Sequence, residues 1–212
     1  MKRPLLLITG IILFGTIASA AWYLSKLNFS KHHHSPVSKA ATAKLSPLLK
    51  EKMGSILSFA KNNGYNTETC FLVDMSIGSG SNRFFIYNPA KDSILDAGLV
   101  THGRCNKNWL TGRQYGNGVG CGCTSLGKYK IGGHYQGKFG LAYKLYGLDS
   151  TNNNAYKRFV VLHSHECVPE DEVDPYPICQ SDGCPTVSPG FLKKLATIID
   201  ASKKPMLLWI HE

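Results

Sequence analysis

The sequence predicts a mainly β fold of the sandwich or barrel type, with one helix before the strands and one near the end of the chain. From residue 70 onward, short runs of branched and aromatic residues are separated by Gly, Asn and Asp, which is typical of an all-β domain rather than of alternating strands and helices. The 21 glycines among 212 residues also suit a fold with many tight turns. Hydrophobic residues make up 43% of the chain and charged residues 18%, so a globular protein is expected rather than a disordered one.

The first 24 residues predict export. Lys2 and Arg3 precede an uncharged run from Pro4 to Leu24, the arrangement of an export signal. Ala18-Ser19-Ala20 offers a site for cleavage, whereas an apolar run of about 20 residues is also long enough to span a bilayer. Residues 1–24 are therefore expected to be either a signal peptide or a membrane anchor, with the rest of the chain outside the cytoplasm.

A linker and a helix are expected next. Residues 25–45 are polar, basic and without periodicity, which predicts a flexible tether, and the three histidines in it are interpreted as solvated rather than as metal ligands. Residues 46–64 predict an amphipathic helix with Ser46 as its N-cap and Gly64 as its stop. The apolar residues of that helix recur at helical spacing, and they are Leu49, Met53, Ile56, Leu57 and Ala60. Residues 65–212 then form the main domain.

The strands of the main domain are predicted from short apolar runs between turns. A hairpin is expected from residues 70–76 and 83–90, because the turn-rich IGSGSN segment joins them. Further strands are expected at residues 93–102, 125–132, 140–149, 157–165 and 206–210. A late helix is expected over residues 190–202, with Ser188 as its cap and Pro189 in its first turn.

The charge and the cysteines narrow the possible functions. A net charge of +10 favours an anionic partner, but no block of basic and aromatic residues is present, so nucleic acid is not expected. Seven cysteines in an exported chain suggest three disulfides and one reactive thiol. A zinc site built on Cys121-x-Cys123 and nearby histidines is less favoured, because the chain has no CxxC pair and no HExxH motif.

The segment Ser181-Asp182-Gly183-Cys184 has the features that a cysteine nucleophile needs. A glycine before the cysteine allows a tight turn, in which the amides of Gly183 and Cys184 can point at one oxyanion. A thiol also needs a base, since its ordinary pKa is about 8.5. His163 follows the apolar run FVVL and is the preferred base, and His165, two residues further on, is the alternative base.

These residues resemble a known family. Leu162-His163 followed by SDGCP resembles the signature of the L,D-transpeptidase catalytic domain (YkuD-like) family, and most closely its murein L,D-transpeptidase branch. Other motifs of that branch occur here in the same order: HGR (102–104), SLGKY (125–129), YQGKFG (135–140), GLD (147–149) and NNNA (152–155). The match covers roughly residues 70–190, and an ordered series of motifs is more specific than any one of them.

The resemblance implies a YkuD-like β-sandwich or barrel and a role for each matching residue. Cys184 would be the nucleophile, His163 the general base, Ser181 a group that orients the imidazole, and the Gly183 and Cys184 amides the oxyanion hole. The implied enzyme attacks the amide after the L-centre of a peptidoglycan stem peptide, forms a thioester and passes the acyl group to an amine. It needs no cofactor and no metal, and it works in the bacterial periplasm or cell envelope.

Departures from the family pattern leave alternatives open. Asp182 stands where the wider family often has a histidine, and Pro185 and Thr186 stand where an Asn or Arg often holds substrate. The alternatives are an L,D-carboxypeptidase or other cysteine hydrolase of the cell wall, and a non-catalytic wall-binding protein. Candidates for substrate contact in the matching motifs are His102, Arg104 and Tyr129. Disulfides are expected between Cys167 and Cys179, between Cys105 and either Cys121 or Cys123, and between Cys70 and the remaining partner.

Overall fold

The computed structural model describes residues 47–212. The predicted export segment (1–24), the predicted linker (25–45) and the Ser46 cap lie outside the described residues. Within residues 47–212, no helix has both the length and the apolar character that crossing a bilayer requires.

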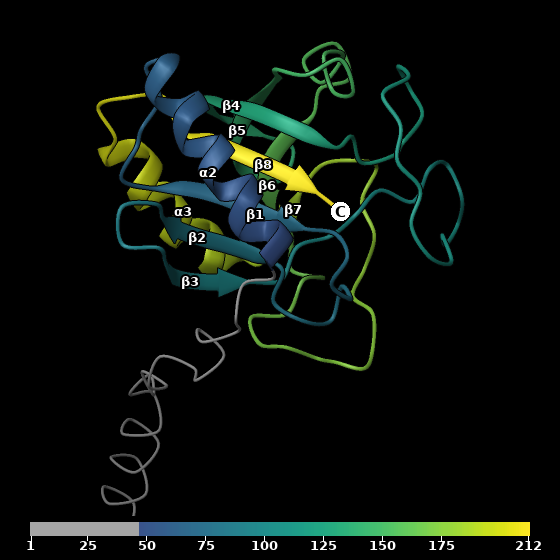
Figure 1. Ribbon diagram of the computed structural model, residues 1–212. Helices are drawn as coiled ribbons and strands as arrows, with labels where there is room; N and C mark the ends of the chain where they lie inside the picture. The colour runs from purple at the N-terminus through teal and green to yellow at the C-terminus, as the bar shows by residue number, and fades with distance from the viewer. Residues whose placement is uncertain (1–46) are drawn as a thin grey trace, which may run out of the picture. The chain divides into compact units, whose positions relative to one another are not determined.

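One helix precedes the strands and a second helix lies between the last two strands (Figure 1). The elements are α2 (Pro47–Asn62), β1 (Cys70–Asp74), β2 (Phe84–Asn88), β3 (Ser93–Gly98), β4 (Gly127–Gly137), β5 (Gly140–Gly147), β6 (Val161–Ser164), β7 (Thr186–Val187), α3 (Pro189–Ala201) and β8 (Leu207–His211). The predicted fold class, mainly β with a helix before the strands and a helix after Cys184, is therefore confirmed.

The eight strands form one sheet in the order β3-β2-β1-β8-β4-β5-β6-β7. The β1–β8 and β6–β7 pairs are parallel, and the other neighbours are antiparallel. The last strand of the chain, β8, thus lies in the middle of the sheet between β1 and β4.

Both faces of the sheet are covered near β1, which explains why that strand is apolar from Cys70 to Val73 instead of alternating. Phe71 and Val73 belong to the core cluster that includes Leu195 of α3, whereas Leu72 belongs to the cluster that includes Ile56 of α2. In Figure 1, α2 lies in front of the sheet and α3 lies behind it. The two helices thus bury the two faces of the sheet.

The start of α3 is held by a cap and by a distant carboxylate. Ser188 accepts a hydrogen bond from the Phe191 amide at 3.2 Å, as its predicted capping role requires. The Glu170 carboxylate accepts from the Gly190 amide and from the Ser188 hydroxyl, each at 2.7 Å, and a negative charge at a helix N-terminus is stabilising. These bonds tie the loop between β6 and β7, which carries Glu170 and Cys184, to the start of α3.

The strands on either side of the predicted catalytic pair differ from expectation. The strand predicted over residues 157–165 is limited to Val161–Ser164, because Phe159 has a left-handed φ of 56° that ends the extended backbone. The two-residue strand β7 was not predicted. It pairs in parallel with β6, with His163 opposite Thr186, and so brings the residues after Cys184 beside the predicted base.

Candidate active site

The turn before Cys184 is closed by its own side chains. The Ser181 hydroxyl donates to the Cys184 carbonyl at 2.7 Å and accepts from the Gly183 amide at 3.1 Å. Gly183 has a φ of 106°, and a Cβ atom there would lie 2.6 Å from the carbonyl oxygen of Cys123. Only glycine fits this position, both for its backbone and for the space around it.

These bonds differ from the expected oxyanion hole, in which the amides of both Gly183 and Cys184 are free to donate. The Gly183 amide, predicted to face an oxyanion, donates to Ser181 in this structure. The hydrogen bonds of the described residues include none from the Cys184 amide, so this amide is the available donor. Ser181, expected to orient the imidazole, is bonded instead within the turn that carries the thiol.

Cys184 is a free, partly accessible cysteine, and its surroundings favour the protonated thiol. Its sulfur lies 3.8 Å from the carbonyl oxygen of Phe159. Burial raises the pKa of the Cys184 thiol, and Asp182 adds to the rise, whereas the Val161 amide and the charge of Arg158 lower it. Since burial is the largest of these effects, the pKa of the thiol is raised, and a base is needed to form the thiolate.

His163 is buried at the end of β6 and is held on both ring nitrogens. Nδ1 lies 3.0 Å from the Ser164 carbonyl oxygen, and Nε2 lies 3.0 Å from the Thr186 hydroxyl. Because a carbonyl only accepts, Nδ1 carries the proton and Nε2 is the nitrogen able to receive one. Burial lowers the pKa of His163, the Ser164 carbonyl opposes this, and His165 lowers it further.

The described residues include no hydrogen bond between the Cys184 thiol and His163. The sequence predicted these two residues as a pair, and the pairing of β6 with β7 brings their strands together. However, the thiol is directed at Phe159 and the Nε2 atom of His163 at Thr186. The catalytic roles of the two residues remain a prediction.

His165, the alternative base, lies in a different environment. Its side chain is exposed, and its Nδ1 accepts from the Cys167 amide at 3.1 Å. The ring of Phe139 stacks on His163 at 5.1 Å between centroids and meets His165 edge-on at 5.3 Å. Phe139 therefore covers the preferred base, and sequence reasoning missed it because it lies in the turn between β4 and β5.

Arg158 is a second residue that the sequence did not single out. Its guanidinium donates to the carbonyl oxygens of Gly116 and Cys123 and to the Ser125 hydroxyl. A Cβ atom at Gly183 would lie 3.1 Å from its Nη2 atom, so the cation stands directly behind the turn. No motif marks this arginine among the 24 basic residues of the chain, and only the folded loops reveal its position.

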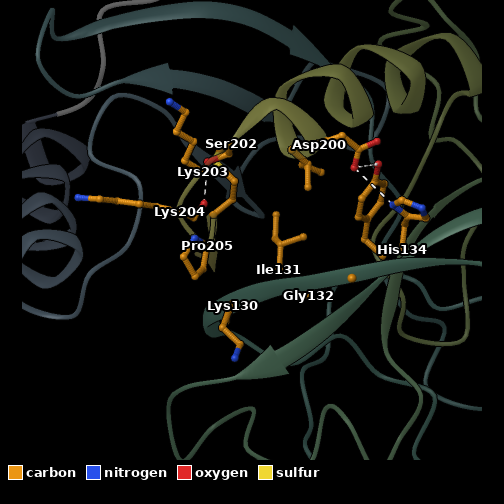
Figure 2. Close-up of a pocket in the computed structure, with 13 residues that line it drawn as sticks. Lys130, Ile131, Gly132, His134, Asp200, Ser202, Lys203, Lys204 and Pro205 are labelled. Atoms are coloured by element: carbon orange, nitrogen blue, oxygen red, sulfur yellow. Dashed lines mark hydrogen bonds and ion pairs between the residues drawn. The ribbon is translucent and has the colours of Figure 1, made fainter.

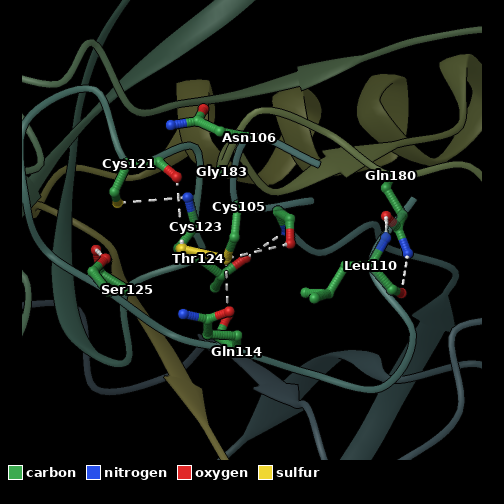
Figure 3. Close-up of a disulfide and its surroundings, with 12 residues drawn as sticks. Cys105, Asn106, Leu110, Gln114, Cys121, Cys123, Thr124, Ser125, Gln180 and Gly183 are labelled. Carbon is green, nitrogen blue, oxygen red and sulfur yellow. Dashed lines mark hydrogen bonds between the residues drawn. A yellow bond between two sulfur atoms is a disulfide. The ribbon is translucent and has the colours of Figure 1, made fainter. Parts of the chain in front are cut away.

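Two disulfides fix the loops around the turn, and they are Cys105–Cys123 and Cys167–Cys179. The Cys167–Cys179 pair is the one expected from the sequence. For Cys105, the sequence left Cys121 and Cys123 as alternative partners, and the partner is Cys123. Figure 3 shows the Cys105–Cys123 bridge beside Gly183, with Cys121 next to it as a free thiol. Residues 47–212, which include all seven cysteines, contain two disulfides instead of the expected three, because Cys121 is free and Cys70 lies buried in the core on β1 as a free thiol.

The three predicted substrate contacts lie in different surroundings. Tyr129 is 1% exposed and its hydroxyl donates to the Ser125 carbonyl at 2.7 Å, so it packs in the core. Arg104 is partly exposed and pairs with Asp182 of the turn at 2.7 Å. His102 is buried and lies at the edge of a hollow that also contains Gln180.

A larger hollow of about 440 Å³ lies elsewhere, between β4, β5, α3 and the segment 202–206 that precedes β8. Figure 2 shows His134 and Asp200 at one end of it, and their Nδ1 and Oδ1 atoms are 3.5 Å apart. The Tyr143 hydroxyl donates to the same Asp200 oxygen at 3.0 Å. None of the predicted site residues lines this hollow. Within the described residues, no group of three or more His, Cys, Asp or Glu side chains is arranged to hold a metal ion.

Comparison with known families gives a clear match. The family model described as the L,D-transpeptidase catalytic domain matches residues 41–211. The resemblance predicted from the sequence is therefore confirmed. No curated protein matches the chain at a significant level.

Solved structures give weaker similarities. One is a point mutant of the helical cell shape determining protein Pgp2 from Campylobacter jejuni, with 14% identity and a TM-score of 0.46, covering 76% of this chain and 54% of that one. Another is an L,D-transpeptidase from Xylanimonas cellulosilytica, with 14% identity and a TM-score of 0.41, covering 73% and 68%. A third is an L,D-transpeptidase from Mycobacterium smegmatis, with 12% identity and a TM-score of 0.39, covering 68% and 59%. The chain thus spans about half the length of the first of these proteins.

Proposed function

This chain belongs to the L,D-transpeptidase catalytic domain family, and from that premise we propose that it is an exported cysteine acyltransferase acting on peptidoglycan stem peptides. One observation carries the proposal. Cys184 is a free, partly accessible thiol on a glycine turn, and this turn leads into a strand paired with the one that bears the buried His163. A nucleophile and a base delivered by neighbouring strands are what covalent acyl transfer needs.

The proposed reaction has two halves. The thiol proton moves to Nε2 of His163, and the sulfur attacks the carbonyl carbon of the amide after the L-centre of the stem peptide. When the tetrahedral intermediate collapses, the C–N bond breaks and the imidazolium returns its proton to the departing amine. An acceptor amine then attacks the thioester carbonyl and gives its proton to His163. The C–S bond breaks, and the imidazolium returns that proton to the sulfur, which restores the free thiol. If water replaces the amine, the same steps give a carboxypeptidase.

The resting geometry indicates what must move first. The thiol faces the Phe159 carbonyl, and Nε2 of His163 faces the Thr186 hydroxyl. We therefore propose that the Cys184 side chain rotates away from Phe159 before it transfers its proton. The Cys184 amide is the proposed oxyanion donor, because the Gly183 amide is bonded to Ser181.

Two features support a location outside the cytoplasm. Two disulfides are present in the described residues, and disulfides persist mainly in oxidising compartments. The uncharged run from Pro4 to Leu24 is the second feature. We propose the bacterial periplasm or cell envelope, reached through a signal peptide or held by an anchor in residues 1–24.

Incubation with defined muropeptides tests the function. Purified protein is mixed with a disaccharide tetrapeptide, intact mass is measured for a thioester on Cys184, and products are separated by liquid chromatography. Cross-linked dimers support transpeptidation, whereas tripeptide without dimers supports the carboxypeptidase. If neither the adduct nor any product forms while Cys184 is in the thiol state, the enzyme proposal is wrong and a wall-binding role replaces it.

A further inference from the structure

A hollow of about 280 Å³ beside His102 has no part in the proposed chemistry. Trp109, Leu110 and Pro177 contribute apolar surface to it, while Arg83 and Arg113 contribute positive charge. A pocket that combines apolar walls with a few directed polar groups is the usual form of a small-molecule site. The polar groups therefore indicate what it can bind.

Arg83 supplies positive charge and an unused donor. It is 1% exposed, and four of the five N–H groups of an arginine are bonded here. Nε and Nη2 donate to the Val100 carbonyl, Nη1 donates to the Ile77 carbonyl, and Nη2 also donates to Nδ1 of His102 at 3.2 Å. The second hydrogen on Nη1 has no acceptor among the described residues. None of the described carboxylates lies within ion-pair distance of this guanidinium.

The contact between His102 and Gln180 provides a second unmatched donor hydrogen. The Gln180 amide is oriented by Leu110, because its oxygen accepts from the Leu110 amide and its nitrogen donates to the Leu110 carbonyl, each at 2.8 Å (Figure 3). That nitrogen lies 3.3 Å from Nε2 of His102. Since Arg83 can only donate to Nδ1, a neutral His102 carries its proton on Nε2 and faces another donor. If the proton is on Nδ1 instead, it faces the Nη2 donor of Arg83. In either tautomer, one donor hydrogen therefore has no acceptor.

The charges around the pocket also bear on which ligand it can bind. Burial lowers the pKa of His102 to about 4, and Arg83 and Arg113 lower it further. Burial, followed by Arg113, lowers the pKa of Arg83 to about 10. Arg113 pairs with Glu212 at 3.6 Å. Arg113 lowers the pKa of both Arg83 and His102, while Tyr115 and Asp74 raise that of Arg83, so the neighbouring arginines favour a further anion over a further cation.

We propose that this pocket binds a free carboxylate of an acidic peptide, with Arg83, Arg113, His102 and Gln180 as its donors. A carboxylate has two oxygens that accept several hydrogen bonds each, so it satisfies the unmatched donors and the positive charge together. The apolar walls favour a carboxylate on an organic chain over a small inorganic anion. Taking that peptide to be a peptidoglycan stem peptide rests on the proposed function.

The pocket and the Cys184 turn share a length of backbone. The Ser181 amide donates to the His102 carbonyl at 2.9 Å, and the Arg104 amide donates to the Ser181 carbonyl at 2.9 Å. Gln180 directs its side chain to Leu110, while the next residue, Ser181, directs its hydroxyl to Cys184. A carboxylate held by Gln180 therefore positions one part of the peptide next to the segment that positions the nucleophile.

Equilibrium binding to the full chain with Cys184→Ala tests this inference without turnover. The probes are a tetrapeptide with free carboxyl groups and the same peptide with those groups amidated. The affinity for each peptide is measured by calorimetry and by tryptophan fluorescence, since Trp109 lines the pocket. We expect the free form to bind about 10- to 100-fold more tightly, the range for hydrogen bonds to a charged group. Arg113→Gln should reduce this preference, the ratio of the two affinities, by about tenfold. Gln180→Glu should remove it entirely, because it adds a negative charge.

Lys107→Gln is the matched control, because it removes a positive charge from an exposed neighbouring loop outside the pocket. It should change both affinities less than about twofold, as expected for a surface charge, and thermal unfolding should show that every variant is folded. Equal affinity for the two peptides, no binding of either, or an Arg113→Gln variant that keeps the full preference would overturn the inference. If the wild-type protein transfers no acyl group while the carboxylate preference persists, the proposed function fails and the pocket assignment stands.

Discussion

Two of the buried histidines in residues 47–212, His163 and His102, differ in what surrounds their rings. Burial lowers the pKa of both. His163 faces a carbonyl on Nδ1 and a hydroxyl on Nε2, whereas His102 faces a guanidinium on Nδ1 and an amide nitrogen on Nε2. The same residue type, equally buried, thus lies between a carbonyl acceptor and a hydroxyl in one region and between two donors in the other.

This difference separates a base from part of a binding site. An acceptor on Nδ1 fixes the proton there and leaves Nε2 basic, which suits proton transfer. Donors on both sides keep a histidine neutral and leave hydrogens without partners, which suits the binding of an anion. We therefore expect changes near His163 to affect rate, and changes near His102 to affect affinity and pH-dependent stability.

The largest expected effect comes from Cys184→Ala. Loss of the nucleophile should reduce acyl transfer by about 10⁴-fold or more, while the affinity for a free carboxylate in the His102 pocket should stay within about twofold of wild type, the range of a change that removes no contact. Product formation and calorimetry measure the two quantities. Cys121→Ser is the control thiol variant and should remain active. Residual activity near wild type in Cys184→Ala would remove this cysteine from the mechanism.

The next largest effect is expected at His163. Replacement by alanine should lower kcat/KM by about 10²- to 10⁴-fold, the usual contribution of a general base. His165→Ala should lower kcat/KM by less than about threefold, because this side chain is exposed and its hydrogen bond to the Cys167 amide stabilises the local turn. Steady-state assays of both variants decide between the two histidines. An inactive His165 variant beside an active His163 variant would show that the base is wrongly assigned.

A smaller effect, on stability, is expected at His102. Its pKa in the folded protein is about 4, below the ordinary value of about 6.5, so the unfolded chain binds more protons between these two values. Stability should therefore be complete above about pH 6.5 and should fall by about 3 kcal/mol as the pH drops to about 4.

Urea unfolding at several pH values measures this loss. His102→Gln should flatten the dependence in that window, whereas His134→Gln is the control, since its side chain is exposed. A wild-type protein whose stability does not change between pH 6.5 and pH 4 would contradict the environment described for His102.

The elements that sequence reasoning found have local causes. The helix after Ser188 is marked by its cap and by Pro189, and β1 is marked by its apolar run. The glycine before Cys184 marks the turn in the same way, and its φ of 106° bears out the need for glycine. Such features depend on residues close in sequence, and they were predictable for that reason.

What sequence reasoning missed depends on distant partners. The strand β7 is two residues long and forms because β6 lies beside it. It is too short for an apolar run to predict it. Arg158 reaches Cys123 across 35 residues of sequence, and Arg83 meets His102 across 19. Their roles come from how loops fold over one another, which composition and spacing do not encode.

The smallest expected effect is at Phe139. Its ring stacks on His163 with an angle of 15° between the planes, so it contributes to the burial that lowers the pKa of that base. Phe139→Ala should expose the imidazole and raise its pKa toward the ordinary value. Because the base acts when unprotonated, the acidic limb of the kcat/KM profile should move to higher pH.

At neutral pH the same change should cost less than about tenfold in kcat, since Phe139 orients the ring without taking part in proton transfer. Phe139→Leu is the matched variant, because it restores apolar cover without a stacked ring and should restore the position of the limb. The pH profiles of the three proteins measure the effect. A limb that stays in place in Phe139→Ala would show that the burial of His163 comes from β6 and β7 alone. The contrast between the two histidines would then depend on their hydrogen-bond partners and not on the ring that covers one of them.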